Sequence, residues 1–228
     1  SCTFFMHVDE NLTEATVFVF ARAEIYLMPA YDGFLELGFS SPVPANKTTF
    51  LKIQTEDDIL NVLLSGGLGN LLADVLGVVL VGNQEFEVQA KSDNTVVLSA
   101  DSVDPTTFDS ARVRIVTDAF GEYYIAITPD QSYNRIYISN RLGSLLGLGN
   151  TRDLDVFGAY YATGSQDCNL PSFTSYDGDG LSVDLLGIGG AGVENPENAI
   201  DANGTTFSEL SLGILSVAAS IEQIIYFD

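Results

Sequence analysis

Apolar residues recur at every second position in several short stretches, and this alternation constrains the fold more than any other feature of the chain. A period of two lets one face of a β-strand lie in a core while the other faces solvent. Turn-forming pairs such as Asp93-Asn94 and Pro129-Asp130 separate the stretches. Short strands at this spacing predict an all-β fold of antiparallel strands, either a sandwich or a barrel. The alternating sets are Leu35, Leu37 and Phe39; Phe86, Val88 and Ala90; Val113 and Ile115; Ile125 and Ile127; and Ile136 and Ile138.

The composition indicates a folded domain with a large core and narrows its partners. Of the 228 residues 46% are hydrophobic, which is enough apolar surface to fold without metal ions or many disulfides. The chain carries nine basic and thirty-one acidic residues, a net charge of −22, so it repels phosphate backbones and anionic membranes. Polar residues and glycines interrupt the longest apolar stretch, residues 60–81. We therefore expect neither nucleic-acid binding nor membrane insertion.

A short motif occurs twice. Residues 8–13 resemble residues 200–205, and the aspartates Asp9 and Asp201 are 192 residues apart. An apolar stretch with a glutamate near its start follows each copy. The repeat predicts a complete module over residues 1–163, a glycine-rich linker over 164–195, and the opening strands of a second module over 196–228. These last strands either begin a module that the natural protein continues or complete the sheet of a neighbouring molecule.

Residues 198–207, Asn-Ala-Ile-Asp-Ala-Asn-Gly-Thr-Thr-Phe, resemble the opening of discoidin-like, galactose-binding jelly rolls. They more closely resemble the repeated extracellular modules of Bacteroidota cell-surface proteins that the type IX system secretes, as do residues 133–138, 142–147 and 154–161. The resemblance covers most of residues 7–161 and again 196–227. It implies a jelly-roll-like sandwich, an extracellular location on a bacterial surface, and an adhesive or structural role. The chain departs from the pattern at Ala202, where glycine is usual, and it has no tryptophan.

Three clusters of aspartate and asparagine are candidate Ca²⁺ sites, because carboxylate and carbonyl oxygens are the ligands that this ion prefers. Two are the copies of the repeated motif, where the resemblance to discoidin-type modules implies a calcium loop. The third begins like an EF-hand loop but lacks its later ligands. The alternative at each place is a turn whose carboxylates cap backbone amides. The candidate ligands are Asp9 and Asn11, Asp201 and Asn203, and Asp177 and Asp179.

Two further predictions concern covalent modification. Cys2 and Cys168 are the only cysteines, and they either form one disulfide or remain two unpaired thiols. Ser102 and Ser110 each follow an aspartate and precede a small apolar residue. That pattern matches the O-glycosylation sequon of the bacterial phylum that the resemblance names. The alternative for both serines is an ordinary polar loop.

The sequence gives little support to catalysis. His7 is the only histidine, and no nucleophile elbow accompanies it. Carboxylate pairs are too abundant to identify a glycosidase site. We therefore expect a non-catalytic structural or adhesive module of a surface repeat protein or filament, whose partners are neighbouring modules or subunits and surface glycans. The alternative is a Ca²⁺-dependent carbohydrate-binding module of galactose-binding type, and a glycoside-active enzyme ranks third.

Overall fold

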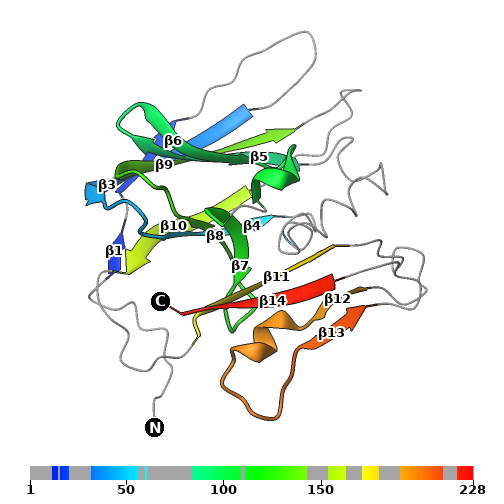
Figure 1. Cartoon of the computed structure of the whole chain (residues 1–228). Coiled ribbons are helices and arrows are strands. Elements are labelled where there is room, and N and C mark those ends of the chain that lie inside the picture. The colour runs from blue at the N-terminus through cyan, green and yellow to red at the C-terminus, as the bar shows by residue number, and fades with distance from the viewer. Residues whose placement is uncertain are drawn as a thin grey trace.

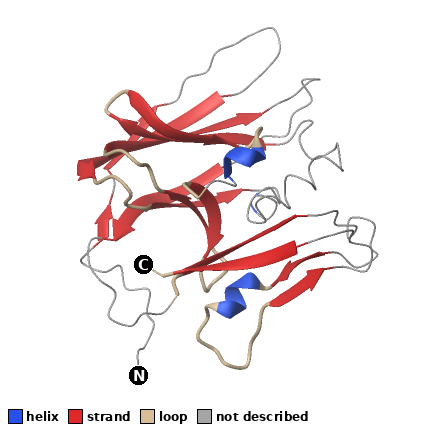
Figure 2. Ribbon diagram, in the orientation of Figure 1, coloured by secondary structure: helices blue, strands red, loops and turns tan. Residues whose placement is uncertain are grey.

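The computed structural model describes residues 12–14, 16–20, 32–55, 60, 84–108, 111–142, 154–162, 171–179, 191–212 and 220–227. They form antiparallel β-sheets with short 3₁₀ turns, which confirms the predicted all-β antiparallel fold (Figure 1, Figure 2). Among these residues no helix is long and apolar enough to cross a membrane. The jelly-roll connectivity stays a prediction.

One layer is a five-stranded sheet in which every neighbouring pair is antiparallel. Its central strands pair with their neighbours along most of their length. The predicted turn at Asp93 and Asn94 joins the last two strands of the sheet. Asp93 has a φ of 53°, a left-handed conformation that aspartate tolerates better than most residues. In order across the sheet, the strands are β2 (Thr16–Phe20), β3 (Asp32–Val43), β9 (Tyr133–Leu142), β5 (Gln84–Ser92) and β6 (Thr95–Asp101).

The second layer is a seven-stranded sheet whose strands curve strongly in Figure 1. Its last two strands lie below the others in Figure 1. A 3₁₀ turn, η1 (Pro105–Phe108), connects the layers between β6 and β7. In order across the sheet, the strands are β1 (Leu12–Glu14), β10 (Leu154–Ala162), β4 (Thr49–Thr55), β8 (Tyr123–Ile127), β7 (Val113–Thr117), β11 (Phe173–Asp179) and β14 (Ser220–Tyr226).

The main core lies between the two sheets and contains the alternating residues that the sequence singled out. Leu37, Phe86 and Ile136 from the five-stranded sheet are at most 1% exposed, as are Ile115 and Ile125 from the seven-stranded sheet. A period of two puts every second side chain on one face of a strand, so the alternating apolar residues of each strand share the face that lies in the core. The predicted alternation is therefore confirmed at its strongest positions.

The side chain of Tyr133 lies in this core, and its hydroxyl contacts the residues at the start of β4. The hydroxyl donates to the carbonyl oxygen of Lys47 at 3.0 Å and lies 2.6 Å from the hydroxyl oxygen of Thr49. Burial raises the pKa of Tyr133 above its usual range. Tyr133 therefore stays protonated and remains a hydrogen-bond donor.

Two strands lie in the segment that follows residue 163, where the sequence predicted a linker. β11 lies inside the segment 164–195 that was predicted to be a linker, yet it pairs with β7 and with β14. β12 (Ala191–Glu194) lies in the same segment and pairs with β13 (Glu209–Leu212). Partners that are distant in sequence satisfy the backbone groups of these strands, so β11 and β12 contribute to sheets, while the division of the chain into two modules stays a prediction.

The last described residues pack on their own chain. The 3₁₀ turn η3 (Pro196–Ala199) precedes the repeated motif and contacts β11, while β12 and β13 both contact β14. β14 is antiparallel to β11 over seven residue pairs, from Phe173 and Tyr226 to Asp179 and Ser220. In this structure β14 therefore pairs within its own chain, and its donation to a neighbouring molecule stays a prediction.

Candidate functional site

Outside the main core, an extensive set of contacts joins the second copy of the motif to the seven-stranded sheet. We refer to this region, which comprises β11, β14, η3 and the aromatic side chains that pack on them, as the junction. β11 joins the main sheet where Thr174 pairs with Thr117 of β7. The backbone N–H of Ser172 donates to the carbonyl oxygen of Tyr226 at 2.9 Å. The strand after the second copy of the motif thus extends the seven-stranded sheet.

Gln223 of β14 links three elements of the junction. Its amide nitrogen lies 3.0 Å from the hydroxyl oxygen of Thr174 on β11 and 2.9 Å from the carbonyl oxygen of Pro196 in η3. Thr174 is fully buried, and its hydroxyl donates to the carbonyl oxygen of Ile224 at 3.0 Å. Each donor has an acceptor here, so the contact fixes η3 against both strands without leaving a buried polar group unpaired.

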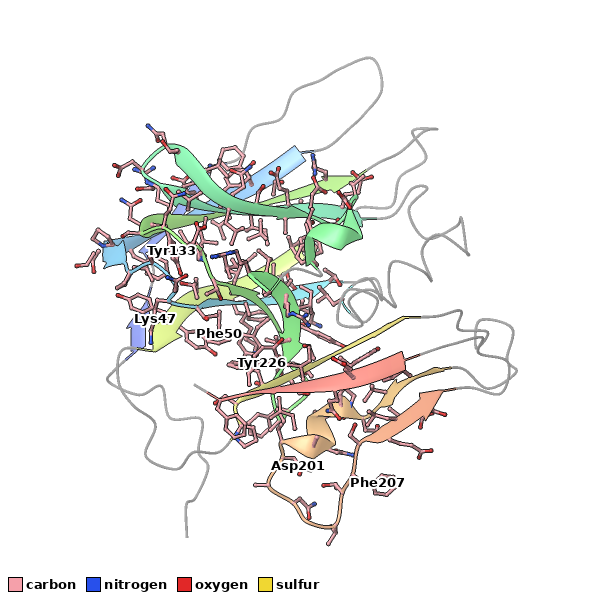
Figure 3. The ribbon with its side chains drawn as sticks, in the orientation of Figure 1. Lys47, Phe50, Tyr133, Asp201, Phe207 and Tyr226 are labelled. Atoms are coloured by element: carbon pink, nitrogen blue, oxygen red, sulfur yellow. The ribbon has the colours of Figure 1, made fainter. Side chains whose placement is uncertain are left out.

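Aromatic side chains fill the concave outer face of the seven-stranded sheet at the junction. The rings of Phe50 and Phe173 are stacked with centroids 4.3 Å apart, and Tyr124 meets Phe173 edge-on at 5.1 Å. Tyr226 packs on this cluster, and its hydroxyl lies 3.1 Å from that of Ser175 (Figure 3). The bend of the sheet thus creates a second core between β4, β8 and β11.

A buried carboxylate supports one side of this cluster. Asp118, in the turn between β7 and β8, accepts backbone N–H bonds from Phe120 at 2.8 Å and Glu122 at 3.0 Å. Its second oxygen accepts the Tyr124 hydroxyl at 3.1 Å. Burial is the largest cause that raises the pKa of Tyr124, and the nearby Tyr160 and Asp118 raise it further. The tyrosine is therefore a neutral donor, and we assign this contact a structural role.

Raised tyrosine pKa values predict a loss of stability in alkaline solution. An acid whose pKa is higher in the folded chain than in the unfolded chain stabilises the fold below the unfolded pKa, about 10 for tyrosine. The contribution of Tyr124 and Tyr133 should be complete at pH 8 and should decrease as the pH rises above about 10. Urea denaturation at a series of pH values measures the decrease.

The matched control for this pH dependence is the double variant Tyr124→Phe, Tyr133→Phe. It cannot ionise at either position, so its free energy of unfolding should fall less steeply above about pH 10, although it starts from a lower value. Equal slopes for the two proteins would contradict the assignment of the effect to these buried hydroxyls.

The second copy of the repeated motif forms a turn held by its own side chains. The carboxylate of Asp201 accepts the backbone N–H of Asn203 at 2.8 Å and the hydroxyl of Thr206 at 2.6 Å. The side-chain oxygen of Asn203 accepts the backbone N–H of Thr205 at 3.1 Å. The Thr206 hydroxyl, followed by the Asn203 amide, lowers the pKa of Asp201. Asp201 and Asn203 thus cap the turn with their side chains, and Ca²⁺ binding by them stays a prediction.

Ala202 stands where the resembling modules have glycine, and its φ is 59°. This left-handed conformation is unfavourable for a residue with a Cβ. We expect Ala202→Gly to relieve the strain and raise the free energy of unfolding by up to about 1 kcal/mol, although the greater freedom of glycine in the unfolded chain opposes part of the gain. Thermal denaturation measures the change. A clear loss of stability would show that the turn is not strained at this residue.

The other candidate metal ligands are not brought to this turn by any described contact. Asp177 and Asp179 lie in β11, where their backbones pair with Glu222 and Ser220 of β14, so this part of the chain is a strand and not an EF-hand-like loop. Asp9 and Asn11 lie outside the described residues. Within the residues that the structure does describe, no cluster of three or more histidine, cysteine, aspartate or glutamate side chains is arranged to hold a metal ion.

The predicted modification sites have different outcomes. Ser102 is only 1% exposed, and its hydroxyl accepts the backbone N–H of Phe86 at 2.8 Å. A glycan on Ser102 would therefore have to be attached before the chain folds, or would require this part of the sheet to open. Ser110, Cys2 and Cys168 lie outside the described residues, so the second glycan and the disulfide stay predictions.

The outer face of the five-stranded sheet carries ion pairs that cross its strands. Glu36 of β3 accepts Arg135 of β9 at 2.6 Å and Lys91 of β5 at 3.3 Å. The Lys91 ammonium also lies 4.0 Å from the ring centroid of Tyr137, so it covers one face of that ring. These cations are thus already paired within an acidic chain, and they do not form a basic patch for a phosphate-bearing ligand.

Comparisons with known proteins add no identification: no family model matches the chain, and neither a curated protein nor a solved structure is significantly similar to it. Gln223, Thr174 and Asp118 have no signal in the sequence, because nothing in a single sequence marks a hydrogen bond between distant strands. Phe157 does have one: Gly158 beside it interrupts an apolar strand, and a glycine at such a place indicates a β-bulge.

Proposed function

We propose that this chain is a non-catalytic, extracellular β-sandwich module of a bacterial surface protein or filament. It acts as a rigid structural unit that spaces neighbouring repeats, and its sides carry an adhesive surface. The observation that supports the proposal is that β14, which follows the second copy of the motif, pairs through β11 with β7 and so continues the seven-stranded sheet. Units that share a sheet resist bending, because bending between them would break backbone hydrogen bonds and uncover the aromatic cluster.

The side chains at the junction support the same role. Gln223 ties η3 to both strands, and Phe173 anchors β11 in the second core. These groups make mutual contacts that fix one element against another. The large net negative charge keeps such a protein soluble and suits screening by salt outside the cell. The repeated motif itself resembles the opening of the surface modules described above.

Single-molecule force spectroscopy tests whether the junction bears load. With handles at the two ends of the chain, residues 173–226 should unfold in the same event as the sandwich. A separate early event would release roughly 180 Å of chain, at about 3.4 Å per residue, and would overturn the proposal. The variant Gln223→Ala should lower the unfolding force. The neighbouring exposed Glu222→Ala on the same strand should leave it unchanged and serves as the matched control.

A further inference from the structure

An irregularity in β10 places one aromatic ring in solvent. The pairing of β10 with β4 shifts between Val156, which faces Ile53, and Gly158, which faces Lys52, so Phe157 is the extra residue of a β-bulge. Gly158 has a φ of 153°, a conformation that favours glycine. Bulges redirect side chains and are frequent beside binding sites. The ring of Phe157 is 60% exposed here.

This exposure contrasts with the other aromatic rings on the same face of the sheet. Tyr160, on the same strand, packs against Phe50 at a centroid distance of 5.8 Å and against Tyr124 at 6.2 Å. Those rings belong to the cluster that β11 and β14 cover. Phe157 lies outside that cluster, so its apolar ring remains in contact with water, which is unfavourable unless a ligand covers it.

Polar groups surround the ring. The Lys52 ammonium lies 5.3 Å from the ring centroid of Phe157 and 3.0 Å from a carboxylate oxygen of Glu122. Gln54 and Asp155 face each other directly across β4 and β10, and both are exposed. The surface thus combines one apolar ring with hydrogen-bond donors and acceptors, and its cation is already neutralised. We call these five residues the bulge platform.

We propose that the bulge platform binds a neutral saccharide. The apolar C–H face of a pyranose stacks on an aromatic ring, while its hydroxyl groups both donate and accept hydrogen bonds, and the platform offers partners for each. A lipid surface or a protein partner would require a larger continuous apolar area than one ring. The net charge of −22 disfavours an anionic glycan. The inference goes beyond the load-bearing role and does not depend on it.

The absence of tryptophan from the chain gives a direct assay. The variant Phe157→Trp carries a single tryptophan on the platform, and Phe207→Trp, at a residue that is 69% exposed in the repeated turn, is the matched control. Both are titrated with linear hexasaccharides of β-1,4-linked glucose, β-1,3-linked glucose and β-1,4-linked mannose. At least one should change the emission of Phe157→Trp in a saturable way, with a Kd on the order of 1 mM or below, and leave Phe207→Trp unchanged.

A second measurement uses the unsubstituted chain. In NMR titrations with the hexasaccharide that binds, amide shifts should concentrate at Lys52, Gln54 and Glu122, and Phe157→Ser should weaken binding at least about tenfold. No saturable change in Phe157→Trp with any of the three sugars at about 10 mM, or the same change in Phe207→Trp, overturns the proposal. The force experiment is unaffected by either result, so the two proposals fail separately.

Discussion

Replacing Phe173 by alanine is expected to lower the free energy of unfolding by about 3–4 kcal/mol, because it removes a buried ring and leaves a cavity that the surrounding strands cannot close. Phe173 is 4% exposed, and its ring stacks on that of Phe50. For a chain of this length the melting temperature should fall by about 10 °C. Calorimetry or urea denaturation measures the loss.

The matched control for this substitution is Phe207→Ala. Phe207 is also a phenylalanine near the second repeat, but it is 69% exposed, so its truncation should change the free energy of unfolding by less than about 0.5 kcal/mol. Similar losses for the two variants would contradict the second core, because they would mean that Phe173 is no better packed than a surface residue.

Proline substitutions on β14 are expected to have unequal effects at adjacent positions. Successive backbone N–H groups point to opposite edges of a strand, and in the described part of the chain only the β11 side of β14 is paired. Of Ile224→Pro and Ile225→Pro, one should therefore remove a ladder hydrogen bond and leave a carbonyl unpaired, at a cost of about 2–3 kcal/mol. The other should cost less than half as much.

Urea denaturation of the two proline variants under one set of conditions compares these losses. The comparison controls for the general effect of proline, since both variants carry it on the same strand. If both variants were as stable as the unsubstituted chain, β14 would not belong to the sheet, and the load-bearing proposal would lose its main support.

The strands of the main core could be predicted because their signal is local. Leu37, Val88 and Ile136 alternate with less buried neighbours, and each lies in the core because one face of its strand is covered along its length. The position of Asp93 and Asn94 was predictable for the same reason, since a turn needs only the residues that form it.

The junction could not be predicted in this way. Asp177 and Asp179 alternate with glycines, a pattern typical of loops, yet β14 pairs with them from more than 40 residues away. Ser102 lies in a sequence that suggests an exposed loop, but its hydroxyl pairs with a strand that precedes it by 16 residues. Long-range pairing of this kind depends on which strand edges remain free after the rest of the sheet has formed.

The sequence by itself determined the class of the fold, the recurrence of a short motif and the large net negative charge, because strand period, motif identity and net charge are properties of the residues alone. Only the tertiary structure decided how the strand after the second copy of the motif pairs and which side chains hold it. Pairing between β11 and β14, the contacts of Gln223 and the exposure of Phe157 at its bulge all depend on strands distant in sequence. Such contacts form when the bent sheet brings these strands together, and no local pattern encodes that geometry.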